Sequence, residues 1–132
     1  MVGVGSLIDS FHSHQVLINT HRDLTVWQKS IELCGAVYSA TRSFPTAERF
    51  GLTAQARRAA VSIASNIAEG AARSSPREFV RFLIIARGSL AELETQIEIA
   101  RRCQIWVPHE ETEDLCKAVG RMLNGLIRSL QR

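Results

Sequence analysis

Small and apolar residues cover most of the circumference of the segment that runs from residue 53 to residue 70. Alanine is the strongest helix former, and no Pro or Gly interrupts the segment before Gly70, so it is predicted to be a helix. Thr53 is a suitable N-cap, and Gly70 lies where the helix can end or weaken. Because a helix that is apolar on more than one side is buried on more than one side, we expect it to contact both flanking helices. It is also a candidate for contact with another subunit.

A second helix is predicted before this one, from Asp23 or Thr25, either of which is able to cap it, to Phe44. Pro45 ends the pattern. Apolar positions at spacings of three and four form one stripe, which comprises Trp27, Ile31, Cys34, Tyr38 and Thr41. A second row lies beside it: Val26, Leu33, Val37, Ala40 and Phe44. The pattern indicates a helix with a broad apolar face.

The clearest helix start follows residue 74. Ser75, Pro76 and Glu78 match the N-cap serine, first-turn proline and glutamate of a capping box. The next residues carry a strict apolar heptad: Phe79, Leu83, Ala86, Leu90, Leu93, Ile97 and Ala100. This repeat predicts a coiled-coil-like packing seam. Gly88 and Ser89 fall in mid-helix, where glycine costs about 1 kcal/mol against alanine, and a close crossing with the alanine-rich helix would justify that cost.

The last helix is predicted to open at Pro108, with acidic residues in its first turns, where their charge is favourable. Its apolar stripe is Leu115, Val119, Met122, Leu126 and Leu130, flanked by Leu123 and Ile127. Four helices with short connections predict an all-α fold, an antiparallel up-and-down four-helix bundle. The bundle is assigned to residues 23–132, and residues 1–22 to a loosely ordered N-terminal extension. Each helix has more apolar surface than one seam needs, which favours homo-oligomerisation.

The composition of this 132-residue chain is typical of a soluble single-domain protein. Its net charge of +3 permits an anionic partner without requiring one. No apolar run is long enough to span a membrane, and the first residues lack the basic start of a secretory signal. The 3 cysteines show no CxxC spacing, which indicates neither a disulfide framework nor a zinc site. We therefore expect a reduced, cytoplasmic setting.

Patterns for catalysis or metal binding are weak. A ferritin-like di-metal site needs Glu-x-x-His on two helices, and the only histidine after residue 21 is His109. His12 and His14 have no carboxylate or thiol partner nearby in sequence, which is more typical of exposed histidines than of a metal site. No GxSxG elbow and no phosphate-binding GxxxxGK sequence occurs. We expect a non-enzymatic protein without a metal or cofactor.

A line of polar residues follows the central helix at spacings of four, three and four: Ser62, Asn66, Glu69 and Arg73. In so apolar a helix, Asn66 and Glu69 must be hydrogen-bonded or face a wet interface. The simpler hypothesis is a structural polar network, in which Glu69 pairs with Arg73, or with Arg57 or Arg58 of another chain. Such networks are common enough that the line does not by itself indicate a functional site.

Arginine supplies nearly all of the positive charge, because only Lys29 and Lys117 among the 16 basic residues are lysines. Arginine matches the geometry of phosphate and carboxylate groups better than lysine does. The candidate phosphate contacts are Arg57, Arg58, Arg73, Arg77 and Arg81. Alternatively these stripes are solvated faces, or they neutralise the carboxylates of the polar network, which are Glu69, Glu92 and Glu94.

Three segments carry a resemblance to a known family: VWQKSIELCGAVY (26–38), FGLTAQARRAAVSIASNIAEGAAR (50–73) and EFVRFLIIARGSLAELETQIEIA (78–100). They closely resemble the 23S rRNA intervening sequence protein family, small bacterial four-helix bundles encoded in insertions within large-subunit ribosomal RNA genes. The residues that match the family pattern are Arg57, Arg58, Asn66, Glu69, Gly70, Arg73, Gly88, Ser89, Glu92 and Glu94. The resemblance covers roughly residues 23–130 and implies a ring-like homopentamer. The family is also similar to the accessory variability protein of diversity-generating retroelements, a basic pentamer that binds nucleic acid and associates with a reverse transcriptase.

The residues and the resemblance together predict a non-enzymatic homo-oligomer whose arginine-rich surface binds the RNA or DNA backbone with little sequence preference. The alternative is a protein-interaction scaffold that docks a partner such as a polymerase and has no nucleic-acid affinity of its own. Nucleic acid that copurifies with the protein would favour the first hypothesis.

Overall fold

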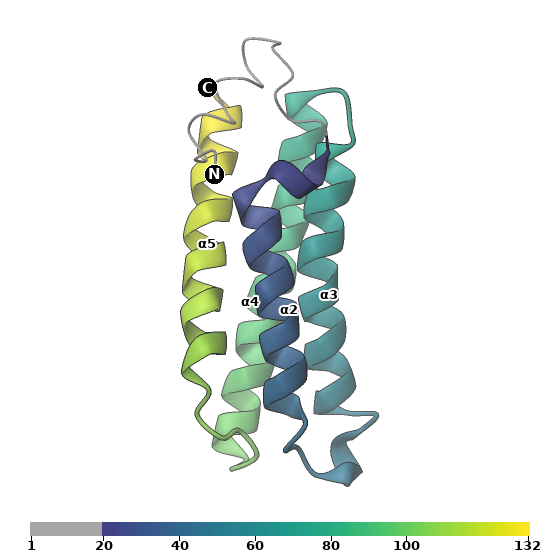
Figure 1. Ribbon diagram of the computed structural model, residues 1–132, viewed down its shortest axis with the longest axis vertical. Coiled ribbons are helices and arrows are strands. Elements are labelled where there is room, and N and C mark those ends of the chain that lie inside the picture. The colour runs from purple at the N-terminus through teal and green to yellow at the C-terminus, as the bar shows by residue number, and fades with distance from the viewer. Residues whose placement is uncertain (1–19) are drawn as a thin grey trace.

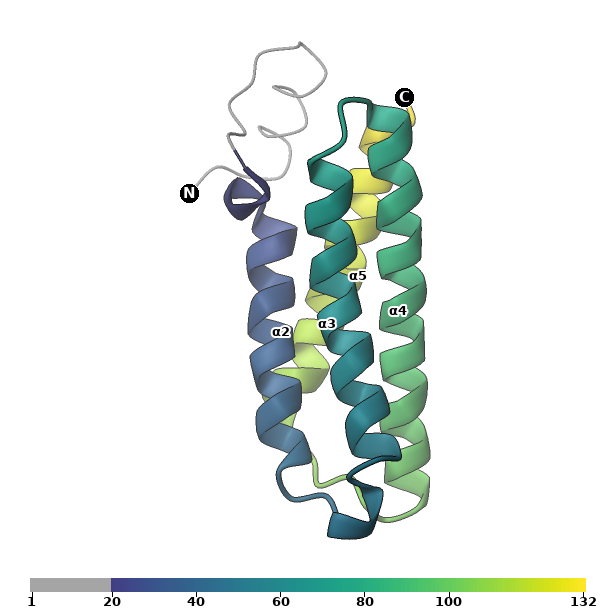
Figure 2. The same ribbon diagram turned by 90° about the vertical axis from the view of Figure 1, so that its right-hand side faces the viewer.

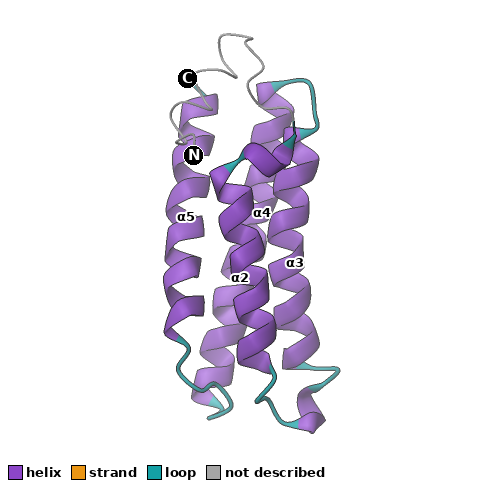
Figure 3. Cartoon of the chain, in the orientation of Figure 1, coloured by secondary structure: helices purple, strands orange, loops and turns teal. Residues whose placement is uncertain are grey.

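The computed structural model describes residues 20–132, and these residues form four long helices and no strand (Figure 1; Figure 3). The helices are α2 (Thr25–Thr41), α3 (Leu52–Ala71), α4 (Pro76–Arg102) and α5 (Glu110–Leu130). Two short 3₁₀ helices, η1 (His21–Asp23) and η2 (Thr46–Glu48), precede α2 and α3. The predicted all-α four-helix bundle is confirmed.

The helices surround one core, in which α2 and α4 lie diagonally opposite and each contacts α3 and α5. Figure 1 and Figure 2 show the connections at alternate ends of the bundle, so that consecutive helices run in opposite directions. We call the end that holds residues 72–75 and 131–132 the upper end, and the end that holds residues 42–51 and 103–109 the lower end. The α3–α4 pair is the most extensively packed.

The core is built on α4, whose seven predicted heptad residues are all buried. From α3 the buried residues include Ala56, Ala59, Ala60, Ile63 and Ile67. Val61, on the outward side of α3, is 43% exposed. The prediction that α3 is buried on more than one side therefore holds only where α2 and α4 cover it.

The core face of α2 follows the second of the two predicted apolar rows. The residues that reach the core include Val26, Ser30, Leu33, Val37 and Ala40. Of the first predicted stripe only Thr41 is buried, whereas Ile31 and Tyr38 are exposed, and Trp27 and Cys34 are half-buried. Two apolar rows lie side by side on α2, and packing against α3 and α5 decides which row turns inward.

The N-terminus of α3 is capped from the preceding connection. Gly51 is the N-cap residue, and Glu48 Oε1 accepts the backbone N–H of Leu52 at 3.1 Å. Thr53 lies inside the first turn and is buried. The prediction of Thr53 as the N-cap was wrong because η2 folds back and places a carboxylate at the helix end, where the macrodipole favours negative charge.

The start of α4 is largely as predicted. Ser75 Oγ accepts the backbone N–H of Glu78 at 3.1 Å, and Pro76 occupies the first turn. The reciprocal bond of a capping box, from the Glu78 side chain, is not formed. Helix α2, in contrast, begins after Leu24 without a side-chain cap, so the predicted caps at residues 23 and 25 were wrong.

Helix α5 begins two residues later than the predicted start at Pro108. His109 is its N-cap, and His109 Nδ1 accepts the backbone N–H of Thr112 at 3.4 Å. The Thr112 hydroxyl lies 2.8 Å from the same nitrogen. The predicted apolar stripe is buried at Leu115, Val119, Leu126 and Leu130, and Met122 is half-buried.

Helices α3 and α4 pack tightly against each other at Gly70. A Cβ at Gly70 would lie 2.7 Å from Phe82 Cβ and 3.2 Å from the carbonyl oxygen of Phe79. Gly88, in contrast, is exposed, and no atom lies within 4 Å of the position that its Cβ would take. The predicted close crossing at Gly88 is therefore wrong, although the neighbouring Ser89 does face α3.

Candidate nucleic-acid interface

The Arg57 side chain makes hydrogen bonds and a ring contact within the chain. Its Nε donates to Thr41 Oγ1 at 2.9 Å, and its Nη2 donates to the Tyr38 carbonyl oxygen at 3.4 Å. The guanidinium also stacks over the Tyr38 ring, 4.6 Å from its centroid. Because these contacts satisfy part of the guanidinium and fix its position, Arg57 joins α3 to the last turn of α2. It is a poor candidate for a phosphate contact.

Arg73, Arg77 and Arg81 lie at the upper end and are all exposed. Arg73 pairs with Glu69 at 3.5 Å and stacks over the Phe82 ring, 5.0 Å from its centroid. Arg77 makes no ion pair or side-chain hydrogen bond with any described residue. Two turns of α4 therefore present positive charge beside the helix N-terminus.

Arg77 and Arg132 line one open groove of about 470 Å³ between the first turn of α4 and the end of α5. Pro76, Val80 and Leu130 form its apolar floor. Both arginines are exposed, and neither makes an ion pair with a described residue. The positive end of the α4 macrodipole lies at the same place. This upper groove combines two arginines that have no ion-pair partner among the described residues with the N-terminus of α4, and Arg132 was not among the predicted phosphate contacts.

The five predicted phosphate contacts do not form one patch. Arg58 lies in the second turn of α3, near the lower end, whereas Arg73 follows the last turn of α3 at the upper end. At 1.5 Å per residue these positions are about 22 Å apart along the bundle. The structure therefore brings together Arg73, Arg77 and Arg81, and separates Arg57 and Arg58 from them.

The predicted polar line divides into two separate groups. Asn66 Nδ2 donates to the Ser62 carbonyl oxygen at 2.8 Å and to Ser62 Oγ at 3.1 Å. Ser62 Oγ lies 2.8 Å from Ser89 Oγ, so this group links α3 to α4. Glu69 and Arg73 form the second group, an exposed ion pair one helical turn apart. Ser89 is a member that the sequence analysis missed, because it is 27 residues away from Ser62 in the chain.

Glu92 and Glu94 belong to neither group. Both are exposed, and neither makes an ion pair or side-chain hydrogen bond with a described residue. Glu92 lines a groove of about 300 Å³ between α3 and α4 together with Arg58, but the two side chains do not pair. The arginines of the single chain thus leave both carboxylates free.

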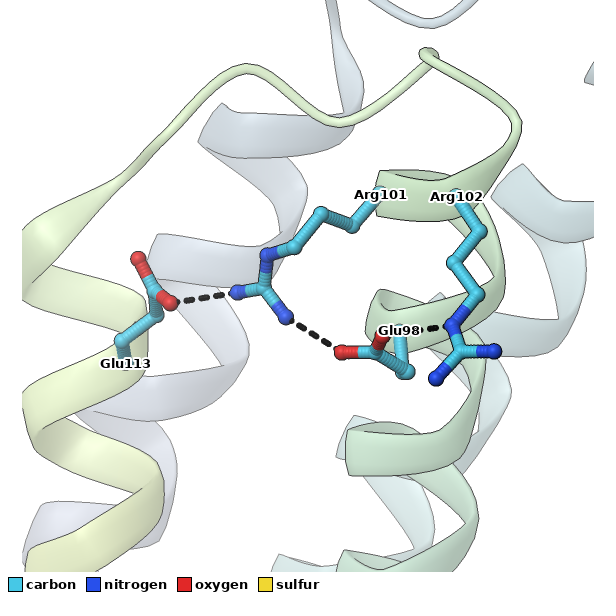
Figure 4. Close-up of polar contacts among 4 residues, drawn as sticks. All are labelled: Glu98, Arg101, Arg102 and Glu113. Carbon is cyan, nitrogen blue, oxygen red and sulfur yellow. Dashed lines mark hydrogen bonds and ion pairs between the residues drawn. The ribbon is translucent and has the colours of Figure 1, made fainter.

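A second arginine pair, at the lower end, is neutralised. Figure 4 shows that Glu98 accepts hydrogen bonds from Arg101 Nη1 at 2.7 Å and from Arg102 Nε at 2.9 Å. Arg101 Nη2 also reaches Glu113 of α5 at 2.5 Å. These ion pairs join the C-terminus of α4 to the N-terminus of α5, where the signs of charge suit both macrodipoles. The positive charges of Arg101 and Arg102 are therefore balanced by these two carboxylates.

The cluster in Figure 4 makes a testable contribution to stability. Hydrogen bonds from Arg102 and Arg101 lower the pKa of Glu98 below its ordinary value. Because the pKa is lower in the folded state, the stabilisation is present above the unfolded-state pKa and is lost as the pH falls through the folded-state pKa. We expect Glu98→Gln to lower Tm near neutral pH, by a small amount because the group is exposed, and to have no effect at strongly acid pH.

The matched control for this prediction is Glu94→Gln, which removes the same charge from a carboxylate without a partner among the described residues. Thermal unfolding followed by circular dichroism across a pH series measures both. Equal pH profiles for the two variants would show that the cluster does not stabilise the fold.

Sites for other chemistry are few among the described residues. No group of three or more His, Cys, Asp or Glu side chains in residues 20–132 could hold a metal ion. His12 and His14 lie outside the described residues. Burial, with the charges of Glu94 and Glu113, raises the pKa of the Cys116 thiol to about 12, so this thiol is not a nucleophile near neutral pH. None of the helices in this part of the chain combines the length and apolar character that a membrane crossing needs.

The fold and its surface define an all-α four-helix bundle protein with an arginine-rich upper end. The family model described as 23S rRNA-intervening sequence protein matches residues 22–125. The chain therefore belongs to this family, which confirms the resemblance noted in the sequence. A comparison with curated proteins found no significant match.

Proposed function

We propose that the protein is a non-enzymatic homo-oligomer of the cytoplasm that binds the RNA or DNA backbone through the upper end of its bundle. The observation that carries this proposal is the upper groove, where Arg77 and Arg132 are exposed and unpaired among the described residues. A guanidinium forms bidentate bonds with phosphate, and a helix N-terminus favours anions. Contacts of this kind recognise the charge of the phosphates and not the bases, so binding is expected to have little sequence preference.

The oligomer is proposed to be a pentamer, the assembly that the family resemblance implies. Exposed apolar side chains on three helices support an assembly of some kind, because a solitary bundle would leave these side chains in water. They are Ile31 and Tyr38 of α2, Val61 of α3, and Ile84 and Ile99 of α4. A ring would repeat the upper groove once in each subunit, which multiplies a modest local charge.

The salt dependence of binding tests the proposal. Wild-type protein is titrated with random-sequence RNA and with duplex DNA over a salt series, with the mass measured by light scattering in the same buffers. Log affinity is expected to fall linearly with log salt concentration, with a slope set by the number of phosphates contacted. Arg77→Gln is expected to weaken binding to all sequences about equally and to reduce that slope by about one.

Arg121→Gln is the matched control for Arg77→Gln. Arg121 is also exposed, but it lines a groove between α2 and α5 together with Glu111 and Asp114, where the surrounding charge is acidic. We expect its removal to leave the slope unchanged. Absence of binding at low salt by an intact oligomer, or equal slopes for both variants, would contradict the proposal.

A protein-docking scaffold is the second candidate function. The observation that favours it is at the lower end, where Phe50 is 81% exposed and Val107 is also exposed. Both lie in connections between helices and not in the core. If nucleic-acid binding is absent, a direct test is binding of a purified reverse transcriptase or other polymerase by wild type and by Phe50→Ser.

A further inference from the structure

The outward face of α4 carries a stripe of four residues: Arg81, Ile85, Gly88 and Glu92. Their spacings of four, three and four place them on one face of the helix. All four are exposed, and Ile85 is 45% exposed. The buried heptad lies on the opposite side of α4, so nothing within the described chain covers this stripe.

Each member of the α4 stripe lacks the contact that its chemistry favours. Arg81 and Glu92 make no ion pair and no side-chain hydrogen bond with any described residue. Glycine weakens a helix interior, yet no atom lies within 4 Å of a Cβ placed at Gly88. Ile85 leaves a large apolar surface in water. Together these features are typical of a surface that another molecule covers.

The stripe is symmetric in position and opposite in charge at its two ends. Its midpoint lies between residues 86 and 87, so Arg81 and Glu92 are equally distant from it, as are Ile85 and Gly88. When two such helices lie antiparallel about that midpoint, each Arg81 faces a Glu92 and each Ile85 faces a Gly88. When they lie parallel in the same register, arginine faces arginine and glutamate faces glutamate, which is unfavourable. Charge therefore selects the antiparallel arrangement.

We propose that the α4 stripe binds a second copy of this chain in an antiparallel, two-fold symmetric contact. Gly88 lets the helices approach closely, Ile85 of each copy packs against the glycine of the other, and two equivalent Arg81–Glu92 ion pairs close the ends. Such a contact uses the same surface on both copies, whereas the contacts that close a ring join two different surfaces. The α4 contact is thus additional to a ring and would join two rings.

This proposal gives Arg81 a role different from that of Arg77. Arg81 takes part in self-association, and Arg77 in phosphate contact. The two roles are separable by experiment: a change at Arg81 alters the mass of the assembly, and a change at Arg77 alters the salt dependence of RNA binding.

Charge reversal tests the contact. Light scattering over a concentration series is expected to give wild-type protein the mass of two joined rings, which is an even number of chains. Arg81→Glu and Glu92→Arg are each expected to raise the dissociation constant of the contact by about tenfold or more and to halve the mass at moderate concentration. The double variant R81E/E92R is expected to restore the wild-type mass, because each new carboxylate again faces a new guanidinium.

Glu94→Arg is the matched control, since it makes the same change two residues away, about 200° around the helix. It is expected to leave the mass unchanged. Gly88→Leu is expected to block the close approach while circular dichroism shows an intact fold, because the single chain has open space there. An odd number of chains in the wild-type assembly, or failure of R81E/E92R to restore the mass, would overturn the proposal without affecting the test of RNA binding.

Discussion

Phe79→Ala is expected to lower the free energy of unfolding by about 3–5 kcal/mol, the range for loss of a buried phenylalanine. Phe79 is 1% exposed and lies in the first turns of α4, where its Cδ1 is 3.0 Å from the position of a Cβ on Gly70. The Phe79 ring fills the upper end of the core. When the ring is removed, the backbone of the two packed helices cannot move far enough to fill the cavity. Since a domain of this size is stable by only about 5–15 kcal/mol, the loss is a large share of the total.

Phe50→Ala is the matched control, because it removes the same side chain from a site that is 81% exposed. It is expected to change the free energy of unfolding by no more than about 0.5 kcal/mol. Urea denaturation followed by circular dichroism measures both variants, at one fixed protein concentration because association adds to apparent stability. Similar losses for Phe79→Ala and Phe50→Ala would contradict the packing described for the upper end.

Gly70→Ala and Gly35→Ala are expected to have opposite effects. At Gly70 a Cβ would lie 2.7 Å from Phe82 Cβ and 3.2 Å from a backbone oxygen, and neither atom can move unless α4 moves. We expect a loss of about 1–3 kcal/mol, as for other overpacked sites. At Gly35, in mid-α2, no atom lies within 4 Å, so alanine is expected to stabilise the helix by about 1 kcal/mol.

The same urea titrations measure the two glycine variants. The difference between the two variants measures the effect of tight packing at Gly70, because the substitution and the gain in helix propensity are the same at both sites. If Gly70→Ala also stabilised the protein, α3 and α4 would not approach as closely as described at that residue.

Ser75 and the α4 heptad show how much of the fold could be predicted. A capping serine acts on the N–H three residues ahead, and a heptad repeats within one helix, so both signals are complete in a short stretch of sequence. The true cap of α3 was missed because Glu48 acts through the shape of the connection. The two rows of α2 could not be ranked from the sequence because both are apolar.

The candidate site was less predictable than the fold. Ser62 and Asn66 were identified because they are polar residues on an apolar helix, but their partner Ser89 lies on another helix. Arg77 was identified from the charge stripe, and its neighbour in the upper groove, Arg132, is more than 50 residues away in sequence. Spacing within one helix contains no information on such distant pairs.

The sequence by itself determined that this protein is a four-helix bundle, because helix propensity, heptad spacing and capping act over a few residues, and the resemblance of three segments identified its family. Tertiary structure alone decided which side of α2 is buried, that α4 packs tightly at Gly70 and not at Gly88, and that Arg57 is held by Tyr38 while Arg77 remains exposed. The physical reason is common to all three. Each depends on which surfaces of two helices meet, and that choice is made by the packing of the whole bundle.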